Sequence, residues 1–192
     1  MTRLRLLAIA SLAVLAAVGL TACGNKKDVE RFAADEGIYF ESGPLKYQVQ
    51  ITRQLNPRQA QDMELMQGIS LANLRLKPDE MWFATFLRVE NETGHPQLTA
   101  RHFVVTDTNG DKFYPVPVNA AANSFAYRPG LLAASGTYST YPNINSIPGQ
   151  TDINGKMLLF KIPRQAIALR PLTLTVFNQL NPATSGSVHL DI

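Results

Sequence analysis

Cys23 is the residue whose chemistry is easiest to define, because it is the only cysteine among 192 residues. A thiolate is a strong nucleophile and can carry a lipid as a stable thioether. Cys23 follows Leu20, Thr21 and Ala22 at the end of an apolar run. An unpaired thiol is otherwise an odd, reactive group in an exported protein. We therefore expect covalent modification to consume this sulfur.

The run before Cys23 has the layout of an export signal. Arg3 and Arg5 give a positive start, and Leu6 to Leu20 is almost wholly apolar. That run is too short for a comfortable membrane-spanning helix, which needs about 20 residues. We expect residues 1–22 to form a signal helix that is removed. The alternative is an uncleaved membrane anchor with an incidental cysteine.

The motif Leu20-Thr21-Ala22-Cys23 resembles the bacterial lipobox. This resemblance implies cleavage between Ala22 and Cys23, a diacylglycerol thioether on Cys23, and a new amino group open to acylation. An anchor with two or three chains holds firmly, because each buried methylene contributes roughly 0.8 kcal/mol. We therefore expect a protein held by lipid on the outer face of the cell membrane.

Cleavage would leave 170 residues (192 − 22), enough for one domain and a linker. Removing two arginines reduces Lys+Arg from 18 to 16, against 15 acidic residues, so the net charge falls to about +1. This balance gives no basic face for nucleic acid. The boundaries we expect are a tether over 23–43 and one domain over 44–192.

The other residues able to do chemistry give weaker signals. His95, His102 and His189 lack the spacing of zinc ligands, so we expect no metal and no cofactor. Asp107, Asn109 and Asp111 suggest a calcium loop, but the glycine is misplaced and the closing glutamate is missing. A hairpin turn explains them better. The sequence thus favours a protein that is not an enzyme.

Aromatic residues gather in the irregular stretch from Asn119 to Gly155. Phe125, Tyr127, Tyr138 and Tyr141 are the best candidates for an interaction surface, since aromatic side chains are enriched at interfaces. The alternative, which the sequence favours, is that these rings cap the open end of the domain. One short strand is expected near Tyr138.

The elements that must position these residues are mostly strands. Alternation is clearest at Leu45–Thr52, and Met81–Val89 is apolar on both faces, which indicates a central strand. Asn56 is the expected N-cap of a short helix over Pro57–Gln67. The remaining strands are expected at 98–106, 112–118, 156–162, 172–177 and 188–192. The pattern predicts a mostly β, antiparallel sandwich of immunoglobulin type with one or two short helices.

Two stretches carry a family resemblance. Trp82–Asn91, and Phe103–Tyr114 with its Asp-x-x-Gly turn, resemble immunoglobulin-like extracellular lipoprotein domains of Gram-positive, especially actinobacterial, cells. Tyr47-Gln48-Val49 and Phe125–Pro129 fit the same group. The resemblance implies a sandwich of unknown function outside the cell and implies no activity. The helical insert at Pro57–Gln67 departs from the simplest form of that domain.

Three functions therefore follow in order. The first is a tethered, non-enzymatic sandwich that binds a protein or an envelope component. The second is a lipoprotein that captures a small ligand between the long loop and the helix, which a deep apolar pocket would favour. The third is a hydrolase, which would need a histidine brought within hydrogen-bond reach of a serine or carboxylate.

Overall fold

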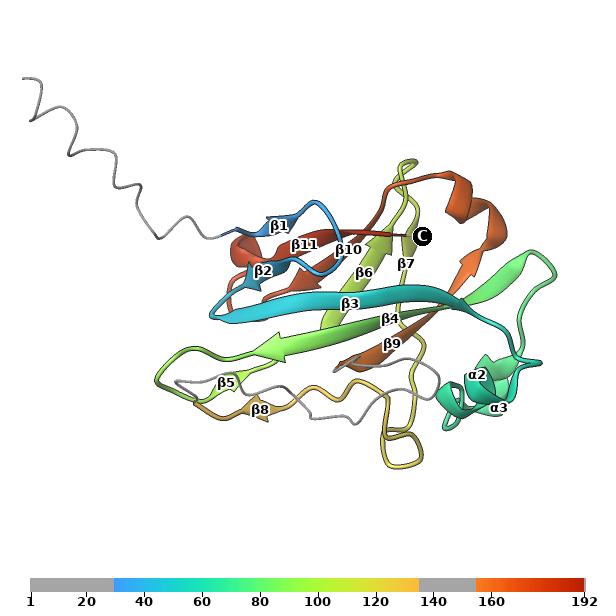
Figure 1. The fold of residues 1–192 in the computed structure, drawn as a ribbon, viewed down its shortest axis with the longest axis horizontal. Coiled ribbons are helices and arrows are strands. Elements are labelled where there is room, and N and C mark those ends of the chain that lie inside the picture. Colours follow the sequence, from blue (N-terminus) through green and yellow to red (C-terminus); the bar gives the residue numbers. More distant parts are fainter. Residues whose placement is uncertain (1–29, 135–154, 192) are drawn as a thin grey trace, which may run out of the picture.

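The computed structural model describes residues 30–134 and 155–191. Two β-sheets pack face to face, as predicted for a mostly β sandwich (Figure 1). The five-stranded sheet has the order β1-β11-β10-β6-β7 and the four-stranded sheet has the order β2-β3-β4-β9, while β5 and β8 pair separately. The strands are β1 (Phe32–Ala33), β2 (Tyr39–Ser42), β3 (Leu45–Leu55), β4 (Glu80–Glu90), β5 (Gln97–Leu98), β6 (His102–Thr106), β7 (Lys112–Phe113), β8 (Leu131–Leu132), β9 (Lys156–Pro163), β10 (Leu172–Phe177) and β11 (Gly186–Leu190).

Strand β4 is central, as its sequence predicts. It pairs with β3 on one side and β9 on the other, and apolar side chains cover both of its faces. Phe83 and Val89 belong to the main core between the sheets. Trp82 and Phe86 belong to a second core on the outer face of the four-stranded sheet. A strand buried on both faces has no polar face, which explains its continuous apolar run.

The hairpin between β6 and β7 forms at the predicted Asn109-Gly110 turn. Gly110 has φ +86°, a conformation that favours glycine. The side-chain Oδ1 of Asp107 accepts the N–H groups of Asn109 and Asp111, both at 3.0 Å. The Asp107 carboxylate therefore holds the turn, as expected for a hairpin rather than a calcium loop.

The helical insert has two short helices, α2 (Ala60–Leu65) and α3 (Leu71–Leu74). Asn56 is not the N-cap that the sequence suggested, because Gln59 occupies that position. The Asn56 side chain instead accepts the N–H of Arg58 two residues on, at 3.0 Å. Such a local turn competes with capping. Buried Asp62 anchors the insert by accepting the backbone N–H of Asn56 at 2.7 Å.

Part of the expected tether belongs to the sandwich. Residues 32–33 form β1 and residues 39–42 form β2, and both Ala33 and Phe40 are 1% exposed. The Ser42 hydroxyl donates to the carbonyl of Val176 at 2.9 Å, which ties this segment to the other sheet. The strand expected over 98–106 is also interrupted, since β5 pairs with β8 and β6 begins at His102.

The two ends of the sandwich differ (Figure 1). At one end, called here the tether end, the chain enters β1 beside the β10–β11 loop, and β5 and β8 lie nearby. The helices α2 and α3 lie at the other end, called the helix end. Strand β3 runs between them, from Leu45 to Leu55.

Within residues 30–134 and 155–191, no helix is long and apolar enough to cross a bilayer. The expected signal helix, Cys23, and the short strand expected near Tyr138 lie outside the described residues. The remaining predicted strands are found as β9, β10 and β11, and a 3-10 helix at Arg164–Ala168 replaces the helical turn expected from Pro163.

Candidate functional site

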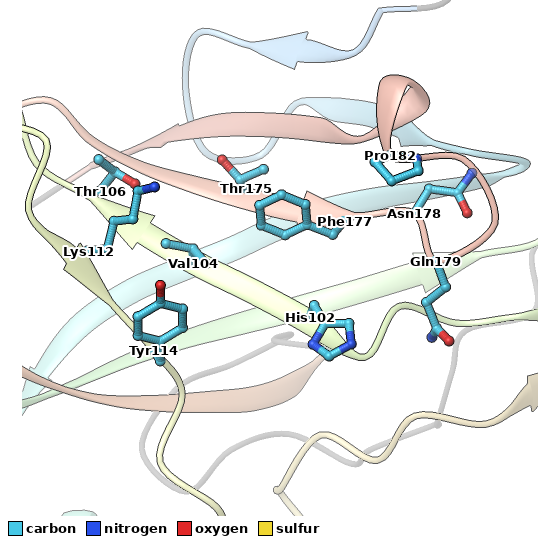
Figure 2. A pocket seen from close by; sticks show the side chains of 10 residues that line it. All are labelled: His102, Val104, Thr106, Lys112, Tyr114, Thr175, Phe177, Asn178, Gln179 and Pro182. Carbon is cyan, nitrogen blue, oxygen red and sulfur yellow. The ribbon is translucent and has the colours of Figure 1, made fainter.

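A groove of about 590 Å³ lies on the outer face of the five-stranded sheet (Figure 2). Alternation along the strands creates this face. Phe103 and Val105 of β6 point into the core, so their neighbours His102, Val104 and Thr106 point out. Its lining residues are His102, Val104, Thr106, Lys112, Tyr114, Thr175, Phe177, Asn178, Gln179 and Pro182.

Val104 and Phe177 form an apolar floor. Phe177 pairs with His102 across β10 and β6, and Val104 pairs with Thr175. Figure 2 shows the floor between Lys112 and Tyr114 on one side and His102 on the other. Tyr114 is 63% exposed. The groove thus combines an apolar floor with a polar rim, which is typical of a binding site.

The loop from β10 to β11 closes one end of the groove. The Asn178 side chain donates to the Thr184 hydroxyl at 2.7 Å and accepts the N–H of Leu180 at 3.0 Å. Gln179 donates to the carbonyl of Thr99 at 3.3 Å. Both amides therefore shape the loop.

Five side chains of the rim and floor keep their polar groups available. Within the described part of the chain, they form no hydrogen bond to protein: His102, Thr106, Lys112, Tyr114 and Thr175. Lys112 is the one residue among them with a fixed charge. This set can donate and accept hydrogen bonds beside an aromatic surface, but it lacks the partnered acid and base of a catalytic site.

The three histidines are not brought together into one site. His102 lies in the groove, His95 lies in the β4–β5 loop, and the His189 ring meets Phe32 edge-on at 4.7 Å. Among residues 30–134 and 155–191, no imidazole bonds to a hydroxyl or carboxylate, and no cluster of His, Cys, Asp and Glu could hold a metal.

Two of the four aromatic residues expected at an interaction surface pack against the core. Phe125 is half-buried against the second core. Tyr127 meets Phe103 edge-on at 5.0 Å, and its hydroxyl donates to the carbonyl of Ala100 at 2.9 Å. These two rings cap the sandwich, the alternative that the sequence favoured. Tyr138 and Tyr141 lie outside the described residues.

A second, apolar hollow of about 520 Å³ lies at the helix end. Its lining consists of Pro57, Met63, Met66, Gln67, Leu74, Leu76 and Trp82. The long loop approaches it, because the Asn123 side chain donates to the carbonyls of Leu65 at 2.8 Å and Gln67 at 2.9 Å. Methionine side chains adapt to apolar ligands of varied shape.

Sequence reasoning missed the groove. It treated His102 only as a metal candidate and did not single out Lys112, Tyr114 or Phe177. The signal that could have found it is an apolar residue on an outward-facing position, as in Phe177 after Thr173 and Thr175. Only the pairing of β6 with β10 brings Phe177 beside Val104.

No family model matches the chain, and no curated protein sequence matches it. Among solved structures, the chain is similar to the yjhA protein from Bacillus subtilis, at 13% identity over 82% of this chain and 99% of that one, with a TM-score of 0.46. It is similar to a "putative lipoprotein (ycdA)" from Bacillus subtilis, at 10% identity over 80% and 38%, with a TM-score of 0.49.

A third similar structure is an uncharacterized β-sandwich protein, CD630_09570, from Clostridium difficile 630. It is 9% identical over 87% of this chain and 99% of that one, with a TM-score of 0.40. Likeness at this level carries no argument about function. The chain is a β-sandwich domain, and the finer resemblance to actinobacterial immunoglobulin-like lipoproteins stays a prediction.

Proposed function

We propose that this protein is a non-enzymatic lipoprotein of the bacterial cell surface, whose sandwich binds another protein or an envelope component in the groove between Lys112 and His102. The lipobox pattern ending at Cys23 supports the tether. A lipid anchor on Cys23 would hold the domain on the outer face of the cell membrane. The lack of a hydrogen-bonded imidazole among the described residues supports a role without catalysis.

The observation that carries the binding proposal is the composition of the groove. Phe177 and Val104 offer apolar contact area, and Tyr114 offers an aromatic ring with a free edge. Aromatic side chains lose little entropy when they contact a partner and are enriched at interfaces. The unpaired donors of Lys112 and Thr106 would then orient that partner.

A photo-crosslinking phenylalanine analogue at Tyr114 tests this proposal in intact cells. The matched control carries the same analogue at Phe32, which is also an exposed aromatic residue on the outer face of this sheet but lies on its opposite edge. We expect a discrete crosslinked product from position 114 that is absent from position 32.

Specificity is tested by adding Phe177→Asn to the chain with the analogue at 114. We expect the product to weaken several-fold, because the apolar floor is lost while the crosslinker is unchanged. Identical products from positions 114 and 32, or no product from either, would contradict binding in the groove.

The apolar hollow at the helix end favours a second function, the capture of a small apolar ligand. Its volume falls within the range of ligand pockets. Trp82 lines it and is the only tryptophan in the chain, so its fluorescence reports occupancy. Titration with lauric acid should shift Trp82 emission if this function holds, and Met63→Glu should abolish the shift. An unchanged emission would count against this function.

A further inference from the structure

Three leucines at the tether end are strongly exposed. Leu98 is 51% exposed, Leu131 is 65% exposed and Leu180 is 82% exposed. Leu98 pairs with Leu131 across β5 and β8. Leu98 and Leu180 line one small crevice. The three side chains therefore form one apolar surface, called here the leucine patch, and such a surface on a folded domain indicates contact with a partner or a membrane.

The chain enters the domain beside this patch. The Arg31 guanidinium donates to the carbonyl of Ala183 at 3.3 Å, and the Arg31 carbonyl accepts the N–H of Ser187 at 2.7 Å. Ala183 belongs to the same β10–β11 loop as Leu180. The point where the tether joins the sandwich is thus fixed close to the leucine patch.

The tether is short. Eight residue steps separate Cys23 from Arg31 (31 − 23). Fully extended, they span about 27 Å at roughly 3.4 Å per residue. The helix end lies farther away by the length of β3, whose 11 residues span about 36 Å. A lipid on Cys23 therefore keeps the tether end near the bilayer and leaves α3 beyond it.

We infer that the leucine patch rests on the lipid surface and gives the anchored domain a fixed orientation, with α2 and α3 facing away from the membrane. The inference rests on the proposed lipid anchor. The anchor supplies the affinity, because it raises the effective concentration of lipid at the patch. The leucines need only contribute the modest apolar contact that selects one orientation.

The test uses the full, lipidated chain in vesicles of phosphatidylcholine and phosphatidylglycerol with nitroxide-labelled acyl chains. Lipid consumes the sulfur of Cys23, so an introduced cysteine is the one thiol available for an environment-sensitive fluorophore. The labelled variants are Leu180→Cys and Leu131→Cys in the patch. The control is Leu71→Cys, which is 84% exposed on α3.

We expect the nitroxide lipids to quench the fluorophore at positions 180 and 131 and to leave position 71 bright. Adding Leu180→Asn should reduce quenching at position 131. Equal quenching at all three positions would overturn the orientation. A chain that floats with the vesicles but shows no quenching would overturn the contact and leave the anchor standing. Failure to float would refute the anchor and, with it, this inference.

Discussion

The backbone of Ala100 is held by two tyrosines, and their removal makes a quantitative prediction. The N–H of Ala100 donates to the Tyr47 hydroxyl at 2.8 Å, while its carbonyl accepts from the Tyr127 hydroxyl at 2.9 Å. Ala100 is 4% exposed and Tyr47 is 1% exposed. This clamp fixes the crossing between β5 and β6, and so the start of the strand that carries His102.

Tyr47→Phe leaves the N–H of Ala100 buried without an acceptor. An unsatisfied buried donor costs about 1–3 kcal/mol. Tyr127→Phe removes a bond to a carbonyl from a half-buried ring, and a typical hydrogen bond contributes only about 1 kcal/mol. In a domain of this size, 2 kcal/mol lowers Tm by roughly 4–8 °C. The Tyr47 variant should therefore be clearly the less stable of the two.

Urea unfolding followed by the fluorescence of Trp82, which is 2% exposed, measures both variants. The midpoints should fall without a change in slope. The double variant should depart from additivity by about 0.5 kcal/mol or more, since both tyrosines bind one residue. Tyr114→Phe is the matched control, and its exposed hydroxyl should change stability by less than about 0.5 kcal/mol. Equal stability of Tyr47→Phe and this control would refute the reasoning.

Three further predictions concern stability. Gly186→Ala should cost about 1–3 kcal/mol, because its Cβ would lie 2.3 Å from the carbonyl oxygen of Glu41, and thermal unfolding would show the loss. Asp62→Ala should cost about 1–3 kcal/mol by freeing the N–H of Asn56, and a urea midpoint equal to wild type would contradict that role. Burial raises the pKa of Tyr47 far above its ordinary 10.0. The unfolded chain therefore ionises first, so stability should be full below about pH 10 and decline above it, and Tyr47→Phe should show a shallower decline.

The long strands could be predicted from the sequence because their burial repeats along the chain itself. The alternation from Leu45 to Thr52 and the continuous apolar run of β4 are local signals. The two-residue strands β1 and β2 carry no such period. They form because Ala33 and Phe40 bury against the ends of the sandwich, an event that depends on strands far along the sequence.

The groove was hidden for the same reason. Alternation shows that His102 and Phe177 point outward, but only the pairing of β6 with β10 makes them neighbours. Tyr127 misled in the other direction. Its ring suggested a surface, whereas Phe103 and the carbonyl of Ala100 engage it in the folded chain. Sequence identifies side-chain type and face, and the long-range register decides which faces join.

The lipid on Cys23 is the claim on which the cellular role depends. Mass spectrometry of the amino-terminal peptide of the protein purified from its native membrane tests it most directly. The account predicts a peptide that begins at Cys23 and carries the mass of a diacylglycerol thioether. A peptide that still contains residues 1–22 and carries a free thiol at Cys23 would contradict it.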